Sequence, residues 1–437
     1  MLLETQFIES LARQSKFVQR HSKLTGGHFS TMMVFHNGNL SDTSLLGHCE
    51  EFMDISNESI KKQSLHERFN ERAVQFFKLL LENVISKKID QIGVWDLLPN
   101  QKRVLIKDST SFQLPEHLKD IYPGSGGATS KSCVKIQFEY DLKTGEVTEL
   151  SIGGFTTTDL TNSYDTIGLI NDSDLLIRDL GYISLDFLEM IQKKSAFFLN
   201  RIKSNVSVWV KDETGLFEPI DLVKIEKRMR KYEIPHQEFD VYLGAKKQLE
   251  CRLVIECLPP EVREKKLRRA HREARREGRT LGQDTISRVG LNLFVTNMSC
   301  EDLPLEHVWP LYRLRWQIEL VFKVFKSVVG INKIKKVKQH RFECYLYGKL
   351  LWALLGWDVY WKVAQSISGE GKVISINKMM KSFRRFCSRI RLNNKDAMMQ
   401  ITDRLEGFIK NVFDNCMLEK RKRNVSSKII IEQIYKI

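Results

Sequence analysis

The chain has 437 residues, which is enough for two or more domains, and it carries a net charge of +15 with a pI near 9.3. This excess of positive charge favours a polyanionic partner, either nucleic acid or a membrane surface. The eight cysteines form no C-x2-C pair, so we expect reduced thiols and neither a zinc site nor a disulfide framework.

The N-terminal region, residues 1–98, has apolar positions at helical spacing and little strand signal. Ser59–Ile85 is the clearest example, with basic residues between the apolar ones. Glu4 and Glu9 stand where a signal peptide would need an apolar run, so none is predicted. The pattern fits a helix-turn-helix-like unit within Ser44–Gln75, and it also fits a helical subdomain packed on a core. Both interpretations stay open.

Two apolar runs in the next segment each lead to an aspartate. Residues 102–108 predict a short strand that ends in Asp108, followed by a cluster of hydroxyl side chains. Residues 175–182 repeat the pattern, with Asp179 after the apolar run and Gly181 at a turn. An acid at the end of a buried strand is costly unless it binds a metal or a cation. Both aspartates are therefore candidate ligands.

Strand-like alternation continues between and after these acids. Residues 135–140 and 147–152 flank a turn and predict a hairpin. Ser184–Lys193 predicts a helix, and Ala196–Ile202 predicts a further strand. The order strand, hairpin, strand, helix, strand indicates a mixed α/β core with acids at the ends of its first and fourth strands.

The segment that follows is too long for one helix and one strand, so it predicts an insertion. Residues 205–257 alternate as strands do, residues 262–279 predict a basic helix, and Leu291–Thr296 predicts a strand that returns to the core. Such dense positive charge neutralises phosphates, although a solvated helix without a partner would show the same pattern. The cations of this helix that we expect to face a polyanion are Arg268, Arg269, Arg272 and Arg276.

Residues 310–329 place four polar side chains at steps of three, four and seven residues, and hence on one face of an α-helix. These side chains are Tyr312, Arg315, Glu319 and Lys326. The opposite face is apolar and consists of Leu311, Leu314, Ile318, Val321, Phe322, Phe325 and Val329. An acid beside two cations and a phenol suits a metal ligand next to a phosphate backbone. An amphipathic helix whose charges face solvent would show the same pattern.

The two upstream aspartates favour the metal site, because three carboxylates give the anionic all-oxygen ligand set that Mg²⁺ prefers. Glu301, Asp302 and Glu306 compete for the third position, but they precede Pro310. Glu319 lies two turns inside the predicted helix, so we predict it as the third acid. Beyond this helix, residues 350–357 are apolar but too short to span a bilayer, and we predict a core helix there.

Three motifs occur in order: D-S-T at Asp108, R-D-L-G-Y at Asp179, and Y-x2-R-x3-E-x6-K over residues 312–326. With them the chain resembles the DDE transposases of bacterial insertion sequences, in the subgroup named for its YREK signature. The resemblance implies an α/β (mixed α+β) fold with an RNase H-like core interrupted by a β-rich insertion, and helical N-terminal and C-terminal regions. The implied segments are 1–98, 99–202, 203–290, 291–365 and 366–437.

The resemblance also implies a chemistry. Asp108, Asp179 and Glu319 would hold two Mg²⁺ ions, with Mn²⁺ as a substitute, for DNA cleavage and strand transfer. Tyr312, Arg315 and Lys326 would hold backbone phosphates, and Trp316 is our candidate for stacking on a flipped base. Relatives proceed through a hairpin intermediate in a cut-and-paste route.

The implied partners are transposon-end DNA with terminal inverted repeats, target DNA, and a second copy of the chain in the DNA complex. Residues 1–98 would recognise the ends, and residues 366–437 would support dimerisation. We expect the bacterial cytoplasm, with association to the nucleoid through DNA, and no membrane partner.

One position departs from the family pattern. Relatives carry a tryptophan that supports the flipped base near the start of the strand before the YREK helix, and Asn292 occupies roughly that place here. Either Trp209 or Phe294 substitutes for it, or the hairpin step differs. Two other functions remain open: a non-mobile RNase H-like nuclease, and a catalytically inactive DNA-binding descendant.

Overall fold

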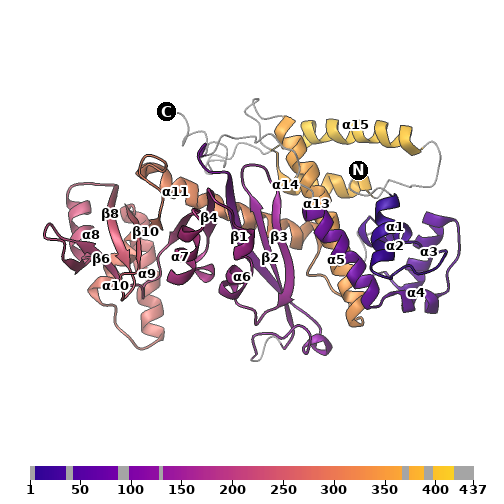
Figure 1. Cartoon of the computed structure of the whole chain (residues 1–437), viewed down its shortest axis with the longest axis horizontal. Coiled ribbons are helices and arrows are strands. Elements are labelled where there is room, and N and C mark those ends of the chain that lie inside the picture. The colour runs from indigo at the N-terminus through magenta and orange to yellow at the C-terminus, as the bar shows by residue number, and fades with distance from the viewer. Residues whose placement is uncertain are drawn as a thin grey trace.

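The computed structural model describes residues 5–35, 43–86, 98–126, 131–366, 374–387 and 397–417. Within these residues ten strands form one mixed sheet in the order β3-β2-β1-β4-β5-β10-β9-β8-β6-β7. Figure 1 shows the sheet at the centre and left of an elongated molecule. The strands are β1 (Arg103–Gln113), β2 (Cys133–Asp141), β3 (Val147–Gly154), β4 (Asp174–Arg178), β5 (Phe197–Arg201), β6 (Val208–Lys211), β7 (Phe217–Pro219), β8 (His236–Leu243), β9 (Leu249–Cys257) and β10 (Leu291–Thr296).

The first five strands form the core of the sheet. β1, β2 and β3 are antiparallel neighbours, whereas β4 pairs parallel with β1 and β5 pairs parallel with β4. This strand order and these directions are RNase H-like, and they confirm the predicted mixed α/β fold class. Two short helices, α6 (Asp159–Asp165) and α7 (Leu185–Lys193), lie in the connections that make β4 and β5 parallel to β1. The side chain of Ser184 caps α7 by accepting from the amide of Phe187.

The predicted hairpin is confirmed as β2 and β3. Its turn contains Gly145 at φ +76°, and a Cβ at this position would lie 2.3 Å from the ring of Trp361. Trp361 belongs to the long helix α13 (Gln339–Ser366), whose Trp357 donates from Nε1 to the carbonyl of Gly145 at 2.9 Å. Glycine therefore gives the turn its left-handed backbone and also lets α13 pack closely.

The predicted insertion continues the core sheet. β10 pairs antiparallel with β5 on one side and with β9 on the other, and β8, β6 and β7 follow outward. The helices of this segment are α8 (Leu222–Lys231), α9 (Pro260–Arg276) and α10 (Gln283–Val289). The predicted basic helix is thus α9, and Glu277 caps its C-terminus.

The segment predicted as the YREK helix is a helical run whose geometry changes along its length. α11 (Leu305–Arg313) contains Pro310 and leads into a 3₁₀ turn, η5 (Leu314–Trp316), then α12 (Gln317–Val324) and a π-helical end, η6 (Phe325–Val329). All seven residues of the predicted apolar face are buried, which confirms that stripe. They join Val104 and Ile106 of β1 in the main hydrophobic core.

The N-terminal region is helical, as predicted, over α1 (Thr5–Gln14), α2 (Gly26–Val34), α3 (Leu45–Ser56), α4 (Lys62–Arg68) and α5 (Glu71–Ser86). It packs on the core through α13, where Nε2 of His48 lies 2.8 Å from the hydroxyl of Tyr345. The C-terminal region contains α14 (Ile376–Cys387) and α15 (Ala397–Asn415). Residues 87–97 and parts of 366–437 lie outside the described residues, and DNA-end recognition and dimerisation stay predictions.

Candidate active site

The pairing register of β1 and β4 brings the two predicted aspartates together. Lys107 of β1 is opposite Arg178 of β4 in parallel register, so Asp108 and Asp179 come next on adjacent strands, which lie about 5 Å apart. Asp179 follows the last residue of β4, as predicted. The prediction that Asp108 ends its strand is wrong, because β1 continues to Gln113 and stays paired with β2 over that length.

Glu319 belongs to the helical run, and the guanidinium of Arg315 lies between Glu319 and Asp108. The guanidinium of Arg315 donates from Nη1 to Oδ2 of Asp108 at 3.3 Å and from Nη2 to Oε1 of Glu319 at 3.5 Å. The Arg315 side chain is 9% exposed, whereas that of Glu319 is 55% exposed. A buried cation therefore connects an exposed acid on α12 with an acid on β1.

The electrostatics show that the three acids act on one another. The pKa of Asp108 is raised to about 6, chiefly by burial and also by the charges of Asp179 and Glu319, against the opposing effects of the Ser109 amide and the Arg315 guanidinium. Burial opposes the charge on Arg315, but Tyr312 and the three acids outweigh it, so the pKa of Arg315 is raised. Three carboxylates and one guanidinium thus form a single electrostatic cluster.

The ligand chemistry of the cluster fits a hard divalent cation, because it contains carboxylate oxygens and neither thiolate nor imidazole. Among the described residues, however, no group of three or more His, Cys, Asp or Glu side chains is arranged to hold a metal ion. The guanidinium of Arg315 lies between Asp108 and Glu319. Metal binding by Asp108, Asp179 and Glu319 stays a prediction.

The other residues of the predicted polar face are less exposed than that pattern suggested. Tyr312 is 3% exposed and packs on Phe294 of β10, with ring centroids 5.1 Å apart. Its hydroxyl and Nε of Arg315 are buried without a hydrogen-bond partner. Lys326 donates from Nζ to the carbonyl of Ser111 at 3.1 Å. The predicted polar face is therefore turned toward the sheet at Tyr312, Arg315 and Lys326, and toward solvent at Glu319.

Trp316 is 53% exposed and lies beside Arg315 on the outer side of the helical run. A tryptophan packed at the edge of the core would show little exposed surface, so Trp316 is not a core side chain. An exposed aromatic ring is free to stack on a base. Base stacking by Trp316 stays a prediction.

Asn292 is buried in a polar network where the family pattern has tryptophan. Its Nδ2 donates to Oε2 of Glu256 at 2.6 Å. Of the two aromatic residues predicted as substitutes, Phe294 is fully buried beneath Tyr312. Trp209 lies three strands away in β6, with the ammonium of Lys247 over its ring at 4.7 Å. Neither ring has a free face beside Asn292.

The four arginines predicted to face a polyanion are exposed along α9. Two of them have acidic partners one turn away: Arg268 pairs with Glu264 at 2.5 Å and Arg269 with Glu273 at 2.9 Å. Exposed pairs of this kind are worth about 0–1 kcal/mol. They can open for a phosphate, and the DNA-binding role of α9 stays a prediction.

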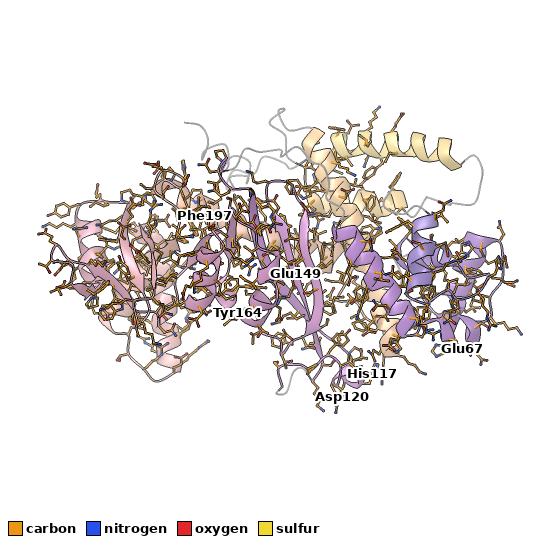
Figure 2. All side chains as sticks on the ribbon, in the orientation of Figure 1. Glu67, His117, Asp120, Glu149, Tyr164 and Phe197 are labelled. Atoms are coloured by element: carbon orange, nitrogen blue, oxygen red, sulfur yellow. The ribbon has the colours of Figure 1, made fainter. Side chains whose placement is uncertain are left out.

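A charged network behind β1 and β4 was not predicted from the sequence. On the sheet face opposite Asp108, Lys107 forms a buried ion pair with Glu149, which Figure 2 labels on β3. Nearby, Nη2 of Arg178 donates to Oε1 of Glu139 at 2.7 Å. Lys107 and Arg178 directly precede the two aspartates. A basic residue inside an apolar run was therefore the sequence signal that could have predicted these buried ion pairs. The network links β1, β2, β3 and β4 on this face of the sheet.

The chain is similar in sequence to known proteins. Residues 99–355 match the family model described as the transposase DDE domain. The chain is 34% identical over 382 residues to the transposase for insertion sequence element IS231F of Bacillus thuringiensis subsp. israelensis, covering 84% of this chain and 80% of that one. It is 32% identical over 363 residues to the transposase for element IS1151 of Clostridium perfringens, covering 80% and 76%.

A solved structure is also similar. The piggyBac transposase in a synaptic complex with hairpin DNA aligns with a TM-score of 0.47 and 11% identity, covering 98% of this chain and 86% of that chain. No helix in the described part of the present chain is long and apolar enough to cross a membrane.

An RNase H-like sheet that gathers three acids at β1, β4 and a following helix defines a class of metal-dependent enzymes that cleave nucleic-acid strands and transfer their ends. Within this class the chain belongs to the DDE transposase family, as the match over residues 99–355 and the insertion-sequence relatives show.

Proposed function

We propose that the chain is the transposase of a bacterial insertion sequence. It binds the terminal inverted repeats of its own element, cuts the DNA there and joins the ends to target DNA by a cut-and-paste route. The observation that carries this proposal is the convergence of Asp108 and Glu319 on the guanidinium of Arg315, with Asp179 directly after the adjacent strand β4. The relatives, which are named as transposases of insertion sequences, support the choice of substrate.

Asp108, Asp179 and Glu319 hold two Mg²⁺ ions in the proposed mechanism, and Mn²⁺ can replace them. When bound, such ions would supply Lewis-acid chemistry for deprotonating the attacking water or 3′-hydroxyl and for stabilising the leaving oxygen. The pKa of Asp108, although raised to about 6, is still below neutral pH, so most of this carboxyl is deprotonated there. The chain supplies no covalent nucleophile in this scheme.

The groups that hold phosphates near the cut are Tyr312, Arg315 and Lys326, the remaining members of the YREK signature. The support is that the Tyr312 hydroxyl and Nε of Arg315 are buried donors without a partner. A buried donor without a partner costs about 1–3 kcal/mol. Phosphate oxygens would remove that cost in the DNA complex and accept charge-assisted hydrogen bonds.

The hairpin step belongs to the same proposal, with Trp316 as the residue that stacks on the flipped base. We also propose a homodimer in the DNA complex, with residues 366–437 as a dimer contact. Within the described part of that region, Leu405 on α15 is 41% exposed. The enzyme acts in the bacterial cytoplasm, on the nucleoid when it is bound to DNA.

The test replaces each acid with alanine. We expect Asp108→Ala, Asp179→Ala and Glu319→Ala to abolish Mg²⁺-dependent cleavage of end DNA and to leave end binding within about threefold, because the acids serve the transition state. Cleavage is measured on labelled end duplexes with Mg²⁺ and with Mn²⁺, and binding is measured in EDTA.

The matched control is Glu306→Ala, which removes an exposed acid from the same helical run. It should cut at the wild-type rate. Measurable cleavage by the Glu319→Ala protein, or its loss in the Glu306→Ala protein, would show that Glu319 is not the third acid.

A further inference from the structure

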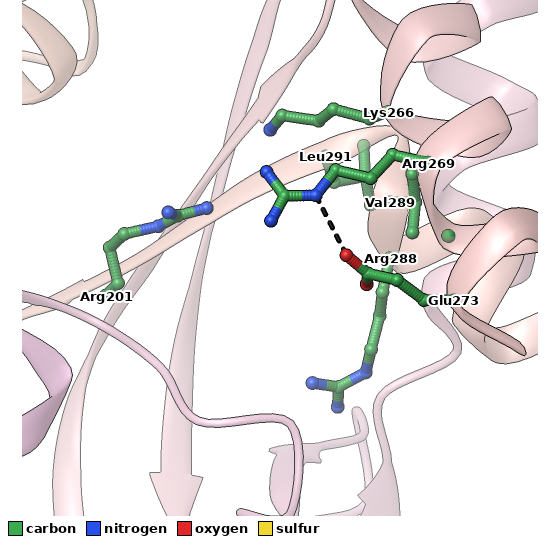
Figure 3. A pocket seen from close by; sticks show the side chains of 8 residues that line it. Arg201, Lys266, Arg269, Glu273, Arg288, Val289 and Leu291 are labelled. Carbon is green, nitrogen blue, oxygen red and sulfur yellow. Dashed lines mark hydrogen bonds and ion pairs between the residues drawn. The ribbon is translucent and has the colours of Figure 1, made fainter. Parts of the chain in front are cut away.

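A cavity of about 330 Å³ lies between the insertion and the core (Figure 3). It is lined by Arg201 from β5, by Lys266, Arg269 and Glu273 from α9, and by Arg288 from α10, above a floor that includes Leu291. Four cations therefore surround the cavity together with one acid. This imbalance is the feature that needs an explanation.

Little of this charge is neutralised inside the cavity. Arg269 donates from Nε to Oε1 of Glu273 at 2.9 Å, which is the interaction that Figure 3 marks among the lining side chains. Arg201 and Lys266 share the amide oxygen of Asn292, with long contacts of 3.4 and 3.5 Å. An amide oxygen brings no negative charge, so these two cations lie close together without a carboxylate between them.

Burial adds to the cost of this arrangement. Burial lowers the pKa of Lys266, and the like charge of Arg201 lowers it further, against the opposing effect of Glu256. Burial also lowers the pKa of Arg288. Partly buried cations that repel one another favour an anion between them.

The cavity lies next to the candidate active site. Arg201 is opposite Phe294 in the register of β5 and β10, and the ring of Phe294 lies beneath that of Tyr312. The charge of Arg201 also acts on the Tyr312 hydroxyl. An anion in the cavity would therefore belong to the same bound molecule as a phosphate held by Tyr312 and Arg315.

We propose that this cavity binds a backbone phosphate of a DNA strand that leaves the active site across the insertion, with Arg201, Lys266 and Arg288 as the contacting groups. This inference rests on the proposed function, in which the active site holds DNA. None of the described lining residues is aromatic, so the cavity recognises the phosphate and sugar and not the base. The strand is either a transposon-end strand or a target strand.

The experiment scans the DNA one phosphate at a time. Single phosphates of an end duplex and of a target duplex are replaced by neutral methylphosphonates, and binding is measured by fluorescence anisotropy in EDTA. The variant combines Arg201→Gln, Lys266→Gln and Arg288→Gln. At one position we expect the neutral linkage to weaken DNA binding by the wild-type protein by about tenfold or more, as for the loss of a hydrogen bond to a charged group. At the same position the neutral linkage should not change DNA binding by the triple variant. The duplex that shows this position identifies the strand.

The matched control removes the same charge from exposed positions of α8, with Lys224→Gln, Lys227→Gln and Arg228→Gln. It should keep the sensitive position, because general attraction to DNA is lowered equally in both variants. If the triple cavity variant melts at a lower temperature, Arg288→Gln alone replaces it. The proposal is overturned if no methylphosphonate position on either duplex loses its effect on binding in the cavity variant. It is also overturned if the α8 control loses the effect at the same position.

This outcome is separate from a failure of the proposed function. A wild-type protein that binds end DNA in EDTA but does not cut it with Mg²⁺ or Mn²⁺ contradicts the proposed function. A protein that cuts end DNA and shows no phosphate coupled to the cavity contradicts this inference alone.

Discussion

Arg315 explains how the three acids can gather in the protein without DNA. Carboxylates that approach one another in a partly buried site repel, and the usual result is that one of them keeps its proton. Here the guanidinium of Arg315 lies between Asp108 and Glu319, and it partly offsets the burial that raises the pKa of Asp108. The same guanidinium keeps Nε without a partner. This free donor is consistent with the proposed contact between Arg315 and a DNA phosphate.

The phosphate contacts give a prediction for single residues. Arg315→Ala and Lys326→Ala should each weaken end binding by about ten- to a hundredfold and lower cleavage, because each removes a charge-assisted bond to phosphate. The losses should not depend on the base at the site, since backbone contacts position the DNA without reading its sequence. Binding is measured on end duplexes with single base changes.

Lys323→Ala is the matched control, because Lys323 is an exposed cation on the same helix. It should change binding by less than about threefold. A change of sequence preference in the Arg315→Ala or Lys326→Ala protein without weaker binding would contradict the phosphate role.

The titration of Asp108 gives a prediction for stability against pH. The folded pKa of about 6 is above the ordinary value of 3.8, so between these pH values the folded protein keeps a proton that the unfolded chain has released. Raising the pH through this interval therefore lowers the free energy of unfolding. Asp108→Asn removes this loss, and its stability relative to the wild type should rise by about 3 kcal/mol at most between pH 4 and pH 7.

The measurement is urea unfolding in EDTA at both pH values. Asp172→Asn is the control, because the Asp172 side chain is 61% exposed and pairs with Lys102 at the surface. It should show no such rise. A stability difference between Asp108→Asn and the wild type that stays constant with pH would show that Asp108 ionises normally in the folded protein.

At the scale of the elements, the sequence predicted those features that local patterns determine. The hairpin, α7, β5 and the apolar stripe of residues 311–329 all appear as expected, because side-chain periodicity and caps act over a few residues. The end of β1 was misplaced. The continuation of β1 past Asp108 depends on pairing with β2, for example Gln113 with Cys133. The polar run Ser109-Thr110-Ser111 lacks the apolar alternation that would have predicted a strand there.

The order of motifs predicted Asp108, Asp179 and Glu319 as the site, and the structure places these acids in one electrostatic cluster. Their catalytic role stays a prediction, and the arrangement of the cluster was not predictable. Which charges meet depends on contacts between residues far apart in the chain, such as Arg315 with Asp108. The cavity at Arg201 was not predictable, because its cations come from three elements that only the folded sheet brings together.

The basic helix α9 gives a prediction at this scale. Replacing Arg268, Arg269, Arg272 and Arg276 with Gln should reduce the salt slope of DNA binding by up to roughly four phosphate contacts. The fold should survive because all four side chains are exposed. The pairs with Glu264 and Glu273 lower the effect of two of them, so a loss of two to four contacts is the expected range.

The slope is measured between low and physiological salt with end DNA. The control replaces four exposed cations on α8 with Gln, which are Lys224, Lys227, Arg228 and Lys231. An unchanged slope in a well-folded α9 variant, or an equal change in the control, would return α9 to a solvated surface helix.

At the scale of the whole molecule, helices and sheet share one main core. Buried residues from Ile8 in α1 to Cys416 near the C-terminus belong to a single hydrophobic cluster, which includes the core strands and α12. The strands of the insertion join the core sheet through β10 (Figure 1). A displacement of a strand in the insertion would therefore be transmitted to the active site through β10 and β5. A displacement of the N-terminal helices would be transmitted through α13.

The contact between the N-terminal helices and α13 gives the last prediction. Gly348 of α13 lies against α2, and a Cβ at this position would stand 2.4 Å from the carbonyl oxygen of Met33. Backbone cannot move aside as a flexible side chain can, so Gly348→Ala should push α2 away from α13 and destabilise the protein by about 1–3 kcal/mol. The N-terminal helices should become sensitive to protease before the sheet does.

Gly407→Ala is the matched control, because Gly407 is a helical glycine on α15 whose Cβ would meet nothing within 4 Å. Alanine there should stabilise the helix by up to about 1 kcal/mol. Thermal unfolding and timed proteolysis compare the two variants, and equal behaviour would show that α2 and α13 separate without cost.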